Sequence, residues 1–320
     1  MLAESVRSGL VESRHDGAVA VCDPDGSLIA SYGEIDRPFF IRSSCKPFQA
    51  YVSQGAGAGL TSLQLALACS SHRGHPSQVA IVEDMLGSFG LSETQLGCPP
   101  DWPANRGAAI RLARAGAKEA RRLWYNCSGK HAAFLRACVA SGWPTGTYLS
   151  PAHPLQTEVT ALVEEIGGFD PKPVGVDGCG APVHRTTARA MARMYARLAS
   201  DQRFDEVFTS MHRYPAMVGG NGEPDSSIAT ALDAVAKGGA QGCIGVGLKS
   251  GGLGIAVKSW DGSGQVATVA AVAALEQLGR LPGPAAERLA EVSAPIVRGG
   301  GEAVGRLENR LRIEAATGWF

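Results

Sequence analysis

The sequence has 320 residues, of which 45% are hydrophobic and 19% charged, and this composition is typical of a globular protein with a substantial core. Basic and acidic residues balance at 30 each without a run of like charge, which excludes the charged surface expected for binding nucleic acid or a membrane. Neither a signal peptide nor a run of about 18 apolar residues is visible, so we expect a cytoplasmic protein that acts on a small molecule.

The predicted elements begin with a β-hairpin, because two apolar runs at 18–22 and 27–31 flank a turn of Asp, Pro and Gly. Helical periodicity then dominates the segments 46–55, 61–70, 76–87, 104–116, 129–140, 154–166 and 183–199. Strands follow at 242–248 and 254–260, with a weaker strand pattern at 300–312. This order predicts an α+β fold whose N- and C-terminal strands form one antiparallel sheet. No linker divides the chain, so 1–320 is expected to be one domain, in which about 60–170 could form a helical subdomain.

The numbers of lysine and cysteine residues and their positions indicate which of them could take part in chemistry. Only seven of the thirty basic residues are lysine, and lysine, unlike arginine, can lose its proton inside a protein. A lysine in this chain is therefore a candidate for chemistry. The eight cysteines are scattered without a CxxC pair, which argues against a disulfide framework and for small buried side chains.

Ser43 and Lys46 form the only Ser-x-x-Lys motif of the chain. The motif follows the apolar segment 39–41 and opens a helical pattern, which places the Ser43 hydroxyl at the positive end of a helix with Lys46 one turn along. Such an environment favours an unprotonated lysine beside a serine nucleophile. The alternative is a serine N-cap with a solvated lysine, and the motif alone does not decide between them.

Two further segments could complete a serine-hydrolase site. Ser71 and His72 lie just before a Pro-initiated helix, in a segment of small and polar residues that could line an active site, whereas His75 is better explained as a helix-end residue. Lys258 follows the strand pattern near the C-terminus and precedes Ser259. A Ser-x-x-Lys start, a second serine and a late strand lysine occur in this order in penicillin-recognising enzymes, although Ser-Asp-Asn and Lys-Thr-Gly are not reproduced.

A third cluster could bind a metal. Cys127, Lys130 and His131 open a helical pattern, and Cys179 lies in a Gly-rich turn after a short strand. Two thiols with an amine or imidazole nearby suit a soft divalent ion, but the spacing does not match that of zinc fingers, and the residues alone leave the question open.

Together these segments resemble the thermolabile, Rhizobium-type L-asparaginase II family. The resemblance rests on five motifs in order: Arg42-Ser-Ser-Cys-Lys-Pro-Phe-Gln49, Cys69-Ser-Ser-His72 with Gly74, Asn126-Cys-Ser-Gly-Lys-His131, Val176-Asp-Gly-Cys-Gly-Ala-Pro182 and Gly252-Leu-Gly-Ile-Ala-Val-Lys258. It implies a serine β-lactamase and glutaminase-like fold, a homodimer, and hydrolysis of L-asparagine to aspartate and ammonia. Two segments, Gly74-His75-Pro76 and 219–223, depart from the family pattern and leave affinity and side-group selectivity open.

The resemblance also assigns roles to individual residues. It implies two catalytic Ser-Lys pairs, Ser43 with Lys46 and Ser71 with Lys258. It implies a zinc ion bound by Cys127, Lys130 and Cys179, which would support substrate binding rather than activate water. Asp177, His131 and Arg42 are the expected substrate-binding residues. Three alternatives remain: a glutaminase or broader amidase, a β-lactam-recognising hydrolase, and a non-catalytic metal- or metabolite-binding protein.

Overall fold

The computed structural model of the chain describes residues 1–316, so the last four residues of the predicted domain lie outside the described part. The strands are β1 (Ala3–Arg7), β2 (Leu10–His15), β3 (Gly17–Cys22), β4 (Leu28–Tyr32), β5 (Phe39–Phe40), β6 (Gly175–Val176), β7 (Pro182–Val183), β8 (Arg185–Thr186), β9 (Ala234–Gly239), β10 (Cys243–Leu248), β11 (Leu253–Ser259), β12 (Ile296–Gly299), β13 (Glu302–Asn309) and β14 (Glu314–Ala315). The helices are α1 (Lys46–Ser53), α2 (Ser62–Ala68), α3 (Pro76–Gly87), α4 (Arg106–Arg114), α5 (Ser128–Ala140), α6 (Pro154–Gly167), α7 (Ala188–Ser200), α8 (Asp205–Arg213), α9 (Pro215–Val218), α10 (Pro224–Ala231), α11 (Gly264–Gln277) and α12 (Gly283–Ser293).

The central element is a six-stranded antiparallel sheet in the order β14-β4-β3-β11-β10-β9. The N-terminal strand β3 pairs directly with the late strand β11, with Ala18 opposite Lys258 and Cys22 opposite Gly254. Segments from the two ends of the chain therefore share one sheet, and the predicted α+β fold is confirmed.

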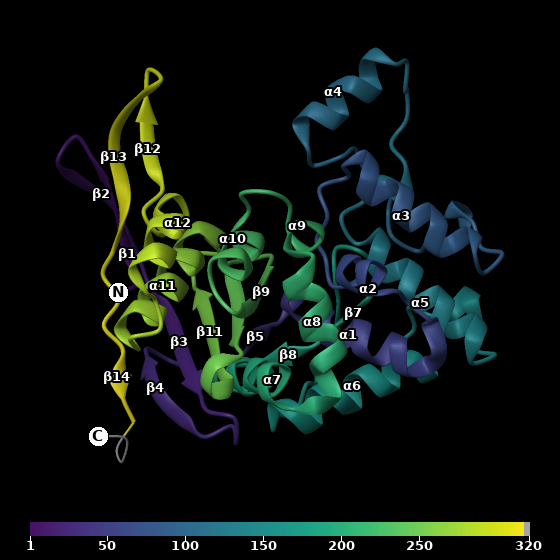
Figure 1. Cartoon of the computed structure of the whole chain (residues 1–320), viewed down its shortest axis with the longest axis horizontal. Helices are drawn as coiled ribbons and strands as arrows, with labels where there is room; N and C mark the ends of the chain where they lie inside the picture. The colour runs from purple at the N-terminus through teal and green to yellow at the C-terminus, as the bar shows by residue number, and fades with distance from the viewer. Residues whose placement is uncertain (317–320) are drawn as a thin grey trace.

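Helices cover both faces of this sheet. On one face α7 packs against β3, β10 and β11, and on the other α11 packs against β10 and β11 (Figure 1). Two apolar cores result, one on each side of the sheet. Gly254 allows the close approach of α7, because an added Cβ would collide with the backbone of Ala192 and Ala196. The sheet is thus buried on both faces, which leaves its edges as places for a site.

A second, four-stranded sheet of order β12-β13-β1-β2 projects beyond the core at one end of the molecule (Figure 1). Of its strands, only β13 was expected from the sequence. The predictions missed β1 and β2, where Glu4, Arg7, Glu12 and Arg14 interrupt the apolar pattern, and these strands bury little of their surface beyond Ala3 and Glu4. Charged side chains on an exposed ribbon hide the alternation that identifies a half-buried strand.

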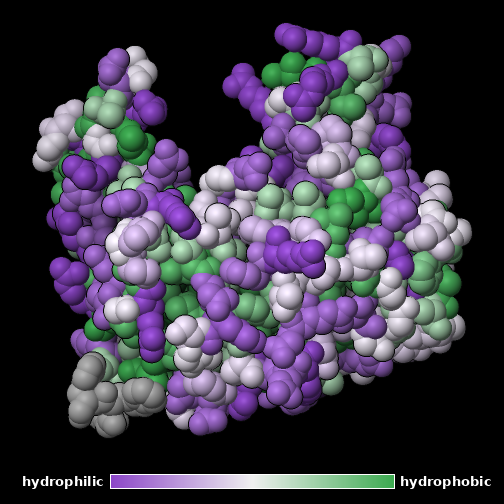
Figure 2. Space-filling model, in the orientation of Figure 1, coloured by the Kyte–Doolittle hydropathy of each residue, from purple (hydrophilic) through white to green (hydrophobic). Residues whose placement is uncertain are grey.

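The segment from α2 to α6 lies on the opposite side of the molecule from the four-stranded sheet (Figure 1). Between the projecting β12–β13 hairpin and α4 the surface is deeply hollowed (Figure 2). Within residues 1–316, no helix combines the length and apolar character needed to cross a membrane. Whether 60–170 forms a subdomain of its own stays a prediction.

Most predicted elements coincide with observed ones. The expected hairpin is β3–β4, and the two late strands are β10 and β11. The helix expected at 183–199 begins only at Ala188, because the preceding residues pair as β7 and β8. The edge strand β9 was not predicted, and this omission affects the site.

Candidate active site

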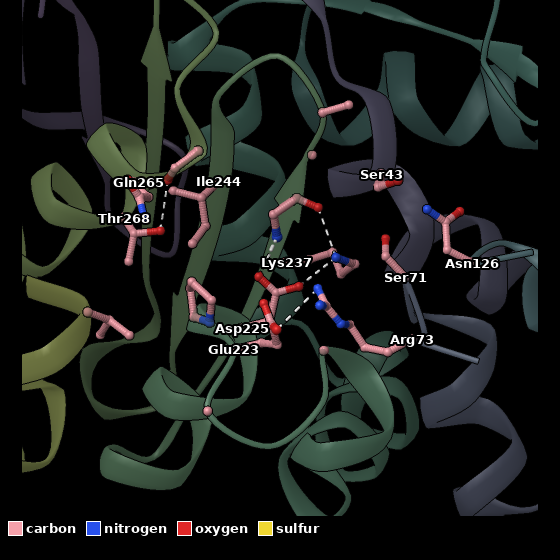
Figure 3. A pocket seen from close by; sticks show the side chains of 18 of the residues that line it. Ser43, Ser71, Arg73, Asn126, Glu223, Asp225, Lys237, Ile244, Gln265 and Thr268 are labelled. Carbon is pink, nitrogen blue, oxygen red and sulfur yellow. Dashed lines mark hydrogen bonds and ion pairs between the residues drawn. The ribbon is translucent and has the colours of Figure 1, made fainter. Parts of the chain in front are cut away.

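A cavity of about 620 Å³ opens beside β9, the edge strand of the six-stranded sheet. It gathers residues from distant parts of the sequence. Its lining includes Ser43, Ser71, His72, Arg73, Asn126, Glu223, Asp225, Lys237, Gly238, Gly239, Ala240, Ile244, Gln265, Thr268, Glu291, Val292 and Pro295. Ser43, Ser71 and Asn126 lie on one side, Gln265 and Thr268 on the other, and Lys237 between them (Figure 3).

Ser43 lies in the 3-10 turn η1 (Arg42–Cys45), which is fixed against β9 by its neighbour Ser44. The Ser44 hydroxyl donates to the backbone carbonyl of Lys237 at 2.9 Å, and the Tyr195 hydroxyl donates to the Ser44 carbonyl at 2.8 Å. The close approach depends on Gly239, where an added Cβ would lie 2.6 Å from the Cys243 sulfur and 3.1 Å from Ser44 Oγ. These contacts hold Ser43 at the wall of the cavity.

Lys46 lies one turn beyond Ser43, at the start of α1, and is only 1% exposed. Its Nζ donates to the Ser70 carbonyl at 2.5 Å and to Ser71 Oγ at 2.9 Å. Burial lowers the pKa of the Lys46 amine, and the positive charge of Lys237 acts in the same direction. A lysine with a lowered pKa can accept a proton from a hydroxyl, so Ser43, Lys46 and Ser71 form a group suited to nucleophilic catalysis.

The structure does not bring Lys258 to this group. Lys258 lies on the central strand β11, where its Nζ donates to the carbonyls of Gln241, at 2.7 Å, and Ser259. Lys237, on the edge strand β9, lines the cavity instead. Its Nζ contacts Asp225 Oδ2 at 2.5 Å and donates to the Gly238 carbonyl at 2.8 Å. Lys258 does not line the cavity, and its pairing with Ser71 stays a prediction.

Two acidic residues that the sequence analysis missed also line the cavity. Asp225, in the first turn of α10, is held by Lys237 and by the Gly238 N–H, which donates to Oδ1 at 2.8 Å. Glu223 forms an ion pair with Arg73, with Oε1 and NH1 3.1 Å apart (Figure 3). Both acids follow the Gly-rich segment 219–222, and the Lys-Gly-Gly sequence on β9 was the available signal for this wall.

The predicted substrate-binding residues Arg42 and Asp177 contact each other rather than line the cavity. Arg42 Nε lies 2.7 Å from Asp177 Oδ1, and both side chains are largely buried. Arg42 has a φ of +52°, which is unusual for a residue with a side chain and directly precedes Ser43. The pair therefore fixes the backbone beside the nucleophile candidate, and an additional part in binding substrate stays a prediction.

The predicted metal ligands lie together in the interior. Cys127 precedes the first turn of α5, Lys130 lies within that turn, and Lys130 Nζ is 3.1 Å from the Cys179 sulfur. A hydrogen bond from Cys127 lowers the pKa of Cys179, and the charge of Lys130 acts in the same direction. Burial would lower the pKa of Lys130, but the sulfurs of Cys179 and Cys127 outweigh it and raise this pKa. Lys130 and Cys179 are thus in direct hydrogen-bond contact in the interior.

His131, the third predicted substrate-binding residue, is also buried. Its Nδ1 is 2.7 Å from the Tyr148 hydroxyl, and burial lowers the pKa of the ring to about 4. Its Nε2 has no hydrogen-bond partner among residues 1–316. The two thiols and the Lys130 amine are the donors that remain for zinc. Over the described part of the chain, no three His, Cys, Asp or Glu side chains are close enough to hold a metal, so the set requires Lys130.

A comparison with known protein families gives a match over most of the chain. The profile of the family L-asparaginase II matches residues 3–309. No curated protein matches the chain. A glutaminase from Bacillus is 13% identical, with a TM-score of 0.46 and coverage of 82% of this chain and 91% of the other. A β-lactamase from Mycobacterium bovis is 16% identical, with a TM-score of 0.40 and coverage of 82% and 94%.

Proposed function

Since the chain belongs to the L-asparaginase II family of amide hydrolases, we propose that it cleaves the side-chain amide of L-asparagine to give aspartate and ammonia. One observation carries this proposal. A buried lysine with a lowered pKa contacts Ser71 and lies one helical turn from Ser43, and both serines line the same cavity.

In the first step Ser43 Oγ attacks the amide carbon while neutral Lys46 takes the hydroxyl proton. The C–O bond forms as the amide carbonyl becomes an oxyanion. Backbone N–H groups of Ser43 and of the end of β9, where Gly239 and Ala240 line the cavity, are the proposed donors to that oxyanion. Collapse of the tetrahedral intermediate breaks the C–N bond, and water then hydrolyses the acyl-enzyme.

The leaving ammonia needs a proton, and Ser71 is the group placed to deliver it. Its hydroxyl is 2.9 Å from Lys46 Nζ, so a proton taken from Ser43 can pass from Lys46 to Ser71 and on to the nitrogen. Lys237 faces the same cavity, and we propose it in place of Lys258 as the second lysine. Its positive charge would stabilise the negative charge that develops in the cavity.

Substrate charges need fixed partners as well. Asp225 and Glu223 are acids on the cavity wall that could receive the α-ammonium group, and Arg73 is a cation that could receive the α-carboxylate. Asp177, His131 and Arg42 remain proposed substrate-binding residues, and the Arg42–Asp177 pair also fixes the backbone next to Ser43.

Zinc is also part of the proposal, with Cys127, Lys130 and Cys179 as its ligands. Bound there, the ion would supply a fixed positive charge and a structural link between α5 and the turn after β6. Ligation requires deprotonated thiols and a neutral Lys130, so zinc would replace the contact between Lys130 and Cys179, and its binding should strengthen as the pH rises. None of the proton transfers above passes through this cluster.

The test is ammonia release from L-asparagine, L-glutamine and D-asparagine, with and without added zinc. We expect L-asparagine to be preferred over L-glutamine by at least about 100-fold in kcat/KM, since one methylene both loses pocket contacts and displaces the carbonyl from Ser43. Glutaminase is the second candidate, because a cavity of about 620 Å³ has room for the longer amide. Comparable rates on the two amides would favour it, and binding of asparagine without ammonia release would refute both.

A further inference from the structure

Ser13, which does not line the cavity beside Ser43, makes hydrogen-bond contacts like those of a serine nucleophile. Ser13 Oγ lies 3.0 Å from His15 Nε2, and His15 Nδ1 contacts Asp261 Oδ2. A serine, a histidine and an aspartate thus form one chain of hydrogen bonds, with the two ring nitrogens used in the order found in serine hydrolases. Ser13 and His15 are partly buried, and the His15 side chain is 17% exposed.

The fold explains why these three side chains meet. Ser13 and His15 are two residues apart on β2, so their side chains lie on the same face of the strand. The Leu2 N–H donates to the His15 carbonyl at 2.8 Å, and the Trp260 N–H donates to the Asp16 carbonyl at 2.9 Å. The first bond belongs to the β1–β2 ribbon, and the second docks the end of β2 onto the turn after β11, where Asp261 lies.

Asp261 is held in place independently of His15. Its Oδ1 accepts hydrogen bonds from the Ser259 hydroxyl and from the Ser263 N–H, which leaves Oδ2 for His15. Burial would raise the pKa of Asp261, but the bonds from Ser259 and His15 outweigh it and lower the pKa to about 2. An ionised carboxylate requires the proton on His15 Nδ1. His15 Nε2 then carries the lone pair that faces Ser13 Oγ, as a general base must.

Ser13 and His15 line a second cavity, which has a volume of about 210 Å³. Its apolar wall consists of Val266, Pro295, Ile296, Val297 and Leu307. The polar side chains of Ser5, Ser263 and Gln265 line the rest of the cavity, and its volume admits only a small substrate. Only Gln265 and Pro295 line both this cavity and the larger one beside Ser43.

Groups that could stabilise an oxyanion border the same cavity. Ser5, directly opposite Ser13 in the β1–β2 register, supplies a hydroxyl, and Gln265 supplies a side-chain amide. The β1–β2 pairing shifts register just after Ser5, and such bulges commonly redirect side chains beside active sites. Hydrogen-bond donors of this kind are what acyl transfer needs besides a nucleophile and a base.

We propose that Ser13, His15 and Asp261 form a second hydrolase site, which cleaves small esters of short acyl groups. Ser13 Oγ attacks the ester carbonyl while His15 Nε2 takes its proton, and the bond from carbon to the alcohol oxygen breaks as His15 returns that proton to the leaving alcohol. Water, deprotonated by His15, then releases the acid and restores Ser13. Each turnover consumes one ester and one water and yields one acid and one alcohol.

The test uses the Ser43→Ala variant, so that the first site cannot contribute. We expect it to hydrolyse p-nitrophenyl butyrate and to be labelled at Ser13 by a fluorophosphonate, with the modified peptide located by mass spectrometry. Adding Ser13→Ala should abolish both signals, and adding His15→Gln or Asp261→Asn should slow both by about 100-fold or more.

Matched controls separate this proposal from the first site. Ser8→Ala changes a serine in the adjoining turn that does not line this cavity, and it should leave ester hydrolysis and labelling unchanged. Ser13→Ala in the otherwise unchanged protein should retain full ammonia release, which also reports correct folding. Failure to label Ser13, labelling that survives His15→Gln, or ester hydrolysis that survives Ser13→Ala would each overturn the proposal.

Discussion

Replacing Lys237 and Lys258 by methionine, one at a time, tests which strand lysine serves the reaction. Both amines are buried, and methionine preserves much of the side-chain length without the charge. Lys237 faces the cavity with Ser43 and Ser71, whereas Lys258 donates to carbonyls of its own strand and of the β9–β10 turn. We therefore expect Lys237→Met to lower kcat/KM by about 100- to 10,000-fold, the usual effect of losing a group that acts in the transition state.

The same substitution should also reduce stability, because Lys237 neutralises Asp225. The two charges are 2.5 Å apart, with side chains 2% and 11% exposed, so Lys237→Met leaves a buried carboxylate without its counter-charge. Breaking a buried ion pair in this way typically costs about 3–5 kcal/mol. The double variant Lys237→Met with Asp225→Asn removes both charges and should recover much of that stability while remaining inactive.

The assays are steady-state ammonia release and urea unfolding of the four proteins. Activity must be measured where the unfolding curve shows a folded protein, so that lost catalysis is not confused with lost structure. A Lys258→Met variant that loses activity while Lys237→Met retains it would refute the assignment and restore the pairing predicted from the sequence.

Three further predictions concern the base, the metal and acid stability. Lys46→Arg should be nearly as inactive as Ser43→Ala, since arginine cannot lose its proton, and wild-type activity should rise with pH through the lowered pKa of Lys46. Metal analysis should find about one zinc per chain, lost in Cys127→Ser, and protein purified without chelators that lacks any transition metal would contradict this. Burial lowers the pKa of His72 to about 3 from 6.5, so its neutral form stabilises the fold above pH 6.5 and this contribution is lost as the pH falls toward 3. Urea unfolding between those pH values should show a flatter pH dependence in His72→Gln, and an unchanged slope would exclude His72 as the cause.

The fold was predictable where burial produces a regular pattern. The runs that became β3, β10 and β11 are almost wholly buried, and their apolar residues identified a sheet made from both ends of the chain. The strand β9 was missed although Ala234 to Lys237 are buried, because a lysine followed by two glycines interrupts its apolar run. The helix α11 was missed because its residues are apolar nearly all round, so no amphipathic period marks it.

Motifs within one helical turn were easier to find than contacts between distant segments. The spacing of Ser43 and Lys46 is fixed by the turn itself, so the sequence could place one beside the other. The contact between Lys130 and Cys179 depends on how α5 packs against the turn after β6, so the residues alone left the cluster open and the resemblance to a family favoured it. The sequence spacing of Ser13, His15 and Asp261 does not predict the contact between His15 and Asp261. That contact forms because β2 docks onto a turn nearly 250 residues later in the chain.

The rarity of lysine was the signal that could have found Lys237. Four of the seven lysines are buried, Lys46, Lys130, Lys237 and Lys258, whereas among the arginines of residues 1–316 only Arg136 is. Burying an amine costs free energy unless the amine is neutral or paired with an opposite charge. In a chain whose arginines lie mostly at the surface, a buried lysine is therefore a candidate functional residue. Lys46 and Lys237 each contact a residue that lines the candidate active site, and Lys130 contacts Cys179 in the interior cluster. Lys258 differs from them because its amine donates to the backbone carbonyls of Gln241 and Ser259, and it does not line the cavity.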